Sequence, residues 1–161
     1  NSEILMQEEL ERMIEVERTI CVVSDGGVDK KGYFGWVVAT GRDIVAKGSG
    51  QAPSEKGMNS SMRAESYGLL TATRFVLHAA RWRKKEPKKV LVWSDSETLI
   101  KRLVAMTRVR CNPREYLRGN ADTFSTIRKT LLELKNFELR HVFGHSIKTA
   151  RIFQNYHGKS N

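Results

Sequence analysis

The stretch that most constrains the fold lies at residues 19–27, where an apolar run ends in a carboxylate and two glycines. Residues 20–23 are four consecutive apolar residues, three of them β-branched, a pattern typical of a strand buried on both faces. Asp25 follows, and Gly26-Gly27 is expected to end the strand. A carboxylate in that place costs free energy unless something pairs with it, so the sequence predicts a partner for Asp25.

The same pattern returns at residues 89–96, where a second apolar run ends in Ser-Asp at Asp95. If the two strands are parallel and adjacent, Asp25 and Asp95 stand at the same carboxyl edge of one sheet. Open α/β sheets place their functional sites at that edge.

A third carboxylate, Glu65, is expected on the buried face of a helix. The apolar stripe of this helix contains Leu69, Ala72 and Val76, and stepping back one turn from Leu69 gives Glu65. Gly68 would let the helix approach a sheet closely. The sequence therefore predicts that Glu65 faces the sheet rather than the solvent.

The spacing of the other segments predicts an α/β fold. Short connections between the strands at 19–27, 33–40 and 44–50 favour an antiparallel meander. The remaining expected elements are an amphipathic helix at 3–17, a helix at 62–82, a strand at 89–95, helices at 98–106 and 122–135, and a strand at 137–143. The first of these is either a linker helix from an upstream domain, residues 1–18, or a packing helix of the domain that follows.

Three carboxylates at one edge would repel each other unless cations neutralise them. Hard oxygen ligands suit Mg²⁺ or Mn²⁺, and two such ions about 3.5–4 Å apart activate water in phosphodiester hydrolysis. Each acid also has a local alternative: Asp25 as a turn residue, Glu65 as a complement to the helix dipole, and Asp95 as a helix cap. Taken together, the three favour a metal site.

The charge distribution favours a polyanionic partner. The chain has a net charge of +10, but residues 1–18 carry −4, so the remaining residues carry +14. Such a surplus of positive charge favours nucleic acid as the first candidate partner and an acidic membrane as the second. The alternative is a basic surface that has no specific partner. No apolar run approaches the ~20 residues that span a bilayer. With only two cysteines we expect no disulfide framework and an intracellular reducing compartment. Separately, we expect a monomer.

Two basic regions carry candidate substrate contacts. Residues 81–89 include Trp82, and residues 101–118 include Arg102, Arg108 and Arg110. Cations beside aromatic residues suit phosphates and exposed bases. A solvated helix end or loop is the alternative for any one of these residues.

Five motifs, in order, resemble the type 1 ribonucleases H, especially the domains of reverse-transcribing elements. The resemblance covers residues 19–145, and its motifs are Ser24-Asp25-Gly26-Gly27, Tyr33-Phe34-Gly35-Trp36, Ser61-Met62-Arg63-Ala64-Glu65, Trp93-Ser94-Asp95-Ser96 and His141-Val142-Phe143-Gly144-His145. It implies a mixed five-stranded sheet in the order 3-2-1-4-5, flanked by helices. It also implies metal-dependent hydrolysis of the RNA strand of RNA–DNA hybrids.

The resemblance further implies roles for individual residues. Asp25 would bridge two metal ions, and Glu65 would bind one of them and help to orient the attacking water. Asp95 would complete the other side, and His145 would assist product release. The residues implied to contact the substrate are Gly26, Ser60, Ser61 and Arg63. Ser60 and Ser61 fall where the family contacts the RNA 2′-hydroxyl group, and Arg63 lies beside them. An upstream polymerase domain is an expected partner.

The chain departs from the family pattern at the fourth metal-ligand aspartate. No Asp or Glu follows Glu138. We therefore expect the domain, residues 19–161, to be truncated at its C-terminus, or its closing element to have decayed. The alternative function is a catalytically impaired nucleic-acid-binding domain. An integrase or transposase core is disfavoured, because such cores place their glutamate last, after the two aspartates.

Overall fold

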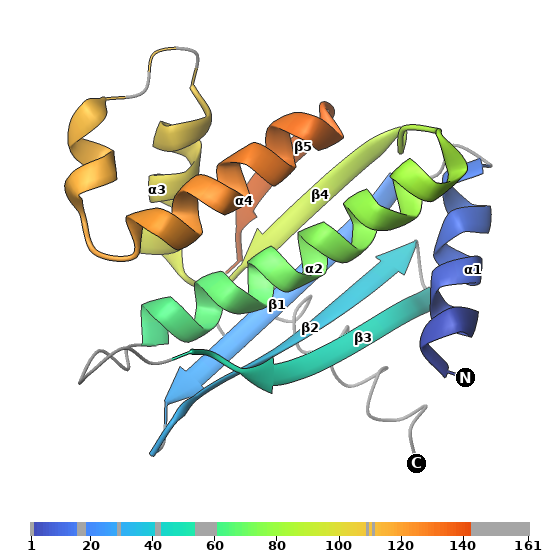
Figure 1. Cartoon of the computed structure of the whole chain (residues 1–161), viewed down its shortest axis with the longest axis horizontal. Coiled ribbons are helices and arrows are strands. Elements are labelled where there is room, and N and C mark those ends of the chain that lie inside the picture. Colours follow the sequence, from blue (N-terminus) through green and yellow to red (C-terminus); the bar gives the residue numbers. More distant parts are fainter. Residues whose placement is uncertain are drawn as a thin grey trace.

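The computed structural model of the chain describes residues 2–15, 19–28, 30–40, 43–53, 61–108, 110 and 112–142. One twisted sheet forms the centre, and the longest helix crosses its face (Figure 1). The strands are β1 Thr19–Val28, β2 Gly32–Thr40, β3 Asp43–Gln51, β4 Lys89–Ser94 and β5 Phe137–His141. The helices are α1 Ser2–Glu15, α2 Ser61–Arg83, α3 Glu97–Thr107, the 3₁₀ helix η1 Pro113–Leu117, and α4 Ala121–Leu134.

The strand order is β3-β2-β1-β4-β5. The first three strands pair antiparallel as a meander, and β4 and β5 are added parallel to β1. This is the mixed sheet in the order 3-2-1-4-5 that the family resemblance implies, so that prediction is confirmed. The α3 and α4 helices supply the crossover that a parallel β4–β5 pair requires.

One boundary expectation was wrong: Gly26 and Gly27 do not end the first strand. The β1 strand continues through both glycines to Val28, paired with β2 down to Gly32. Its pairing with β4 stops at Ser24, opposite Ser94. Both glycines stay extended because β2 pairs with them on one side of β1. On the other side of β1, the pairing with β4 has already ended.

The core lies between the sheet and the α2 helix. Val22 of β1, Val92 of β4 and Leu69 of α2 are fully buried in one hydrophobic cluster. Gly68 provides the expected close approach, because a Cβ atom there would lie 3.1 Å from the Cβ of Phe34. Burial of this stripe, at about 25 cal/mol per Å² of apolar area, orients α2 firmly over β1.

The α1 helix packs on the same core. Leu10 and Ile14 have no exposed surface and belong to the central hydrophobic cluster. The Glu11 carboxylate is buried and accepts hydrogen bonds from Gln7 and Arg83, which ties α1 to the end of α2. The structure thus shows a packing helix, one of the two alternatives, and its role as a linker to an upstream domain stays a prediction.

Among the described residues, no helix combines the length and the apolar character that a bilayer crossing requires.

Candidate metal centre

The register of the parallel β1–β4 pair brings two aspartates together. Ser24 lies opposite Ser94, so Asp25 and Asp95 each follow the last residue of that pairing. Both serines are buried, at 3% and 1% exposure, which fixes the edge from which the aspartates project. The Asp25 Oδ1 atom also accepts a hydrogen bond from the Gly26 amide at 2.8 Å. The two Ser-Asp repeats therefore form one edge, as the sequence predicts.

The α2 helix delivers Glu65 to the same edge. Glu65 is the fifth residue of α2, so it lies beyond the first turn, where a helix-dipole role was the alternative. A Cβ atom at Gly26 would lie 2.6 Å from the Glu65 amide nitrogen. Any larger residue at position 26 would push the helix away, so Gly26 sets the distance between β1 and Glu65. This packing role was not foreseen from the sequence, which suggested only a substrate contact.

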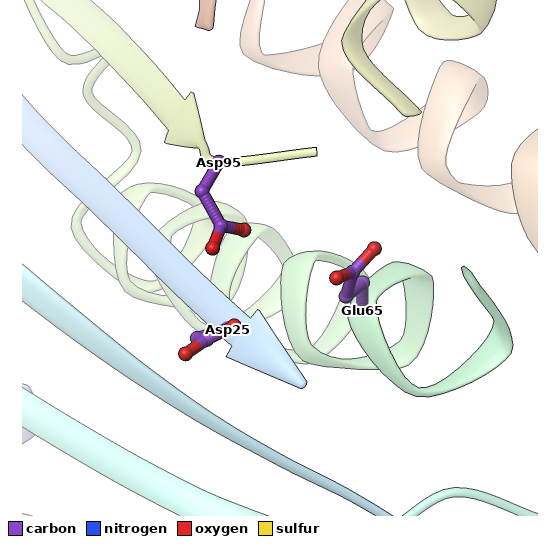
Figure 2. A group of neighbouring side chains, drawn as sticks. All are labelled: Asp25, Glu65 and Asp95. Carbon is purple, nitrogen blue, oxygen red and sulfur yellow. The ribbon is translucent and has the colours of Figure 1, made fainter. Parts of the chain in front are cut away.

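Asp25, Glu65 and Asp95 converge on one point (Figure 2). One carboxylate oxygen from each residue lies within 4.8 Å of the other two. Asp25 is exposed and the other two are half-buried, so solvent ions reach the cluster. The Asp95 Oδ1 atom is buried yet has no hydrogen-bond partner. A buried acceptor without a donor is costly, and a cation would satisfy it. The donor set, all carboxylate oxygens, fits Mg²⁺ or Mn²⁺.

The protonation of Glu65 reflects this crowding. Its pKa is raised to about 7, first by burial and then by the charges of Asp95 and Asp25, while a hydrogen bond from the Ser96 side chain lowers it. Without a cation, the cluster therefore relieves its repulsion by holding a proton on Glu65 near neutral pH. A bound divalent cation would take the place of that proton.

Ser96 is a site residue that sequence reasoning missed. Its side chain accepts a hydrogen bond from the Leu99 amide and so caps α3. The cap role suggested as an alternative for Asp95 is thus wrong, which leaves the Asp95 carboxylate to the cluster. The same serine contacts Glu65, so it joins the start of α3 to α2. The Ser-Glu sequence at a helix start could have signalled the cap, but not the contact to α2.

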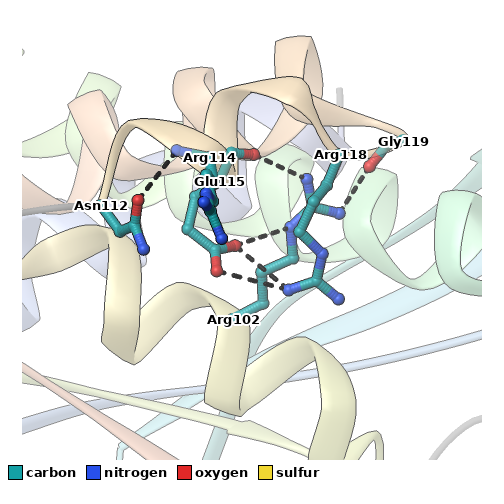
Figure 3. A network of polar contacts seen from close by, with 6 residues as sticks. All are labelled: Arg102, Asn112, Arg114, Glu115, Arg118 and Gly119. Atoms are coloured by element: carbon teal, nitrogen blue, oxygen red, sulfur yellow. Dashed lines mark hydrogen bonds and ion pairs between the residues drawn. The ribbon is translucent and has the colours of Figure 1, made fainter.

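Arg102 is buried rather than offered to solvent, and Figure 3 shows its polar contacts with the segment that follows α3. Its guanidinium lies 4.0 Å from the centre of the Phe124 ring and donates hydrogen bonds to the carbonyl groups of Gly119 and Glu115. The Glu115 carboxylate also pairs with Arg118 at 3.2 Å. Arg102 therefore holds the segment after α3 in place, and the substrate contact predicted for it stays a prediction that these internal bonds do not favour.

Arg63 plays a similar internal role on the other side of the same segment. It is 8% exposed and donates hydrogen bonds to the Pro53 carbonyl and to the Asn120 side chain. It also lies over the Tyr67 ring. Asn120 adopts a left-handed conformation with φ of 63°, and this contact helps to hold it there. Ser61, also predicted to contact the substrate, is exposed at the first position of α2.

The exposed cations of the second basic region form what we call the basic arm, residues 108–120. Arg108, Arg110 and Arg114 are exposed there, as is Arg118 in part. Trp82 is exposed too, but at the opposite end of α2 from Glu65. Two further predicted residues, Ser60 and His145, lie outside the described residues.

Comparisons with known proteins give fold likeness only. No family model matches the chain, and no curated protein matches it. Among solved structures, the N-terminal RNase H domain of a Mycobacterium tuberculosis protein, solved as a fusion with maltose-binding protein, is 17% identical with a TM-score of 0.52. That match covers 77% of this chain and 86% of the other.

Two further solved structures are similar to this chain in fold. LC9-RNase H1, described as a type 1 RNase H with the type 2 active-site motif, is 15% identical with a TM-score of 0.55, covering 87% of this chain and 69% of that chain. The foamy viral protease-reverse transcriptase in complex with an RNA/DNA hybrid is 15% identical with a TM-score of 0.53. That match covers 89% of this chain but spans only 19% of the viral one. The protein thus has an RNase H-like fold.

Proposed function

We propose that this RNase H-like domain is a metal-dependent endonuclease that hydrolyses the RNA strand of RNA–DNA hybrids. The observation that carries the proposal is the meeting of Asp25, Glu65 and Asp95 at one sheet edge, with oxygens within 4.8 Å of one another. Likeness to a reverse transcriptase described in complex with an RNA/DNA hybrid supports the substrate.

In this proposal the residues of the site have separate roles. Asp25, Glu65 and Asp95 would hold two Mg²⁺ or Mn²⁺ ions, which supply an activated water and stabilise the leaving oxygen when bound. The β1–β4 register fixes the aspartates, while Gly26 fixes the approach of α2. Because the pKa of Glu65 is raised to about 7, this carboxyl group must lose a proton before it can bind a cation tightly.

Substrate binding would come from the exposed cations. Arg108, Arg110 and Arg114 of the basic arm would contact phosphates, and the excess charge outside residues 1–18 would raise the association rate. Ser61 at the start of α2 would lie against the RNA strand close to Glu65. Contacts by Ser60 and product release by His145 remain part of the proposal, as do an upstream polymerase partner and a reducing intracellular compartment.

The test is cleavage of a labelled RNA–DNA hybrid, with double-stranded DNA and double-stranded RNA as comparison substrates. We expect cleavage of the hybrid RNA strand that requires Mg²⁺ or Mn²⁺ and falls at least about 100-fold in Asp95→Asn, since an amide cannot replace an anionic ligand. Asp122→Asn, at an exposed position on α4, is the matched control and should retain activity. Equal cleavage by both variants would refute the proposal.

A second candidate function follows from one observation. No Asp or Glu follows Glu138 in the chain, so a fourth carboxylate ligand cannot come from that part of it. A non-catalytic domain of this fold would bind hybrids in a salt-sensitive way, unaffected by Mg²⁺ or by Asp95→Asn, and would cleave none of the three substrates.

A further inference from the structure

Asp95 lies just beyond the part of β4 that the sheet holds in register. The pairing of β4 with β1 stops at Ser94, and the pairing of β4 with β5 also stops at Ser94, opposite His141. Among the described residues, no strand residue is therefore paired with Asp95. Contacts outside the strand pairing must place the residue that brings its carboxylate to the cluster.

The carboxylate of Asp95 is not held through its buried oxygen. Among the described residues, the Oδ1 atom is buried and accepts no hydrogen bond. In the metal-free protein the place of this oxygen therefore depends on the backbone of Asp95. Metal ligands must be held within about 0.5 Å of their productive geometry, so a small rotation of this backbone would matter.

His141 makes a contact that holds this backbone. Its ring Nε2 atom lies 3.2 Å from the carbonyl oxygen of Asp95. Because a carbonyl oxygen only accepts, the ring is the donor and the proton lies on Nε2. His141 is the last residue of β5, and the next amide, that of Val142, donates to the Ser94 carbonyl at 3.0 Å. The strand pairing thus anchors the histidine, and its ring reaches one residue past the end of β4.

The peptide group that joins Asp95 to Ser96 is bonded on both of its polar sides. Its amide donates to the Ser94 side chain at 3.1 Å, and its carbonyl accepts from His141. Asp95 and His141 are both half-buried, so water competes less for this bond than it would at the surface. Two bonds on opposite sides of one peptide plane fix its rotation, and loss of the histidine bond would leave the plane held on one side only.

The neighbouring acid Glu97 does not account for the position of the ring. The charge of His141 is a minor cause of the lowered pKa of Glu97, and the hydrogen bond from Lys101 is the main one. Lys101 Nζ lies 2.8 Å from the Glu97 carboxylate. Glu97 thus has a closer partner, and the hydrogen bond of the ring goes to Asp95.

We propose that His141 is a positioning residue of the metal centre. By holding the peptide group that follows Asp95, it keeps the Asp95 carboxylate where it can share a cation with Asp25 and Glu65. This inference rests on the proposed metal-dependent function, and in it His141 acts only through Asp95. The family resemblance implied a role for His145 alone, so the sequence gave no reason to assign one to His141.

The experiment measures Mn²⁺ binding to the full chain by isothermal titration calorimetry. We expect His141→Phe, which keeps a ring but has no donor, to raise Kd about tenfold, since partners that orient metal ligands commonly contribute 10–100-fold in affinity. His141→Gln should stay within about threefold of the wild type, because its amide nitrogen can donate from nearly the same place. His141→Asn, whose shorter side chain does not reach the carbonyl, should resemble His141→Phe.

Two controls separate positioning from a general effect on folding. His78→Phe makes the same substitution at an exposed position of α2 and should bind Mn²⁺ like the wild type. Urea denaturation in EDTA measures the stability of each variant, and a purely structural role would lower the free energy of unfolding but leave Kd unchanged. If His141→Phe does not fold, the comparison of His141→Gln with His141→Asn decides the question.

Cleavage of the hybrid gives a second readout. The Mg²⁺ concentration for half-maximal cleavage should rise in parallel with Kd, while KM for the hybrid changes by less than about twofold. Equal Kd values for the wild type and His141→Phe would overturn the inference, as would a His141→Gln variant that binds as weakly as His141→Asn. A wild-type protein that binds no Mn²⁺ and cleaves no hybrid would instead overturn the proposed function, and this inference with it.

Discussion

The substitution Glu65→Gln should stabilise the metal-free protein above neutral pH. The pKa of Glu65 is raised from 4.5 to about 7, mainly by burial. A carboxyl group whose pKa is higher in the folded state contributes stability below pH 4.5 that is lost as the pH rises through about 7. At 1.36 kcal/mol per pKa unit, the free energy of unfolding lost on deprotonation is about 3 kcal/mol, and partial solvent screening of the carboxylate reduces this loss to about 1–3 kcal/mol.

Glutamine resembles the protonated glutamate in shape and carries no charge at any pH. In EDTA at pH 8, the variant should therefore exceed the wild type in free energy of unfolding by about 1–3 kcal/mol. At pH 4, where the wild-type carboxyl group is protonated in the folded state, the difference should vanish. Urea denaturation at the two pH values measures both quantities.

Addition of Mg²⁺ should narrow or reverse this stability difference at pH 8. A cation that binds only the folded wild type stabilises it by about 2.7 kcal/mol at a concentration one hundred times its dissociation constant. The variant, with one anionic ligand fewer, should gain much less. A Glu65→Gln variant less stable than the wild type in EDTA at pH 8 would refute this prediction, as would equal stabilisation of both proteins by Mg²⁺.

Three other substitutions test the contacts around the site. Gly26→Ala should lower the free energy of unfolding, measured by urea denaturation, by about 1–3 kcal/mol, because its Cβ would meet the backbone of α2 at 2.6 Å. Gly35→Ala, whose Cβ would lie 3.8 Å from its nearest neighbour, should lower it clearly less. Arg102→Met should lower the free energy of unfolding by about 1–3 kcal/mol, because the carbonyl groups of Glu115 and Gly119 lose their donor. It should also raise KM for the hybrid more than it lowers kcat, and an unchanged KM would show that the basic arm does not need this anchor. Ser96→Ala should lose about 1 kcal/mol of thermal stability that Ser96→Asn retains, since asparagine also caps helices, and equal melting temperatures for the two would exclude the cap.

The strand and helix pattern was accessible from the sequence because it depends on neighbouring residues. Four apolar residues in a row before Asp25 indicated a buried strand, and the stripe through Leu69 placed Glu65 toward the sheet. The repeated Ser-Asp ending then placed Asp25 and Asp95 at one edge, given parallel pairing. The expected end of β1 at its glycines failed because the partner strand β2, rather than local preference, keeps them extended.

The contacts that the sequence did not reveal join residues far apart in the chain. Arg102 reads as one more cation in a basic segment, yet the structure buries it against Phe124. The Ser-Glu pair at residues 96–97 could have identified Ser96 as a helix cap, but nothing nearby in the chain predicts its contact with Glu65. Trp82 reads as part of a substrate-binding region, but the length of α2 separates it from the carboxylates.

The sequence by itself determined which elements form and which residue types stand at their ends, because hydrophobic periodicity and turn chemistry act over a few residues. Only the tertiary structure decided that three carboxylate oxygens lie within 4.8 Å of one another and that Gly26 sets the approach of α2. Distances of that kind depend on the packing of whole helices against the sheet, where a shift of one atom's width changes which groups meet.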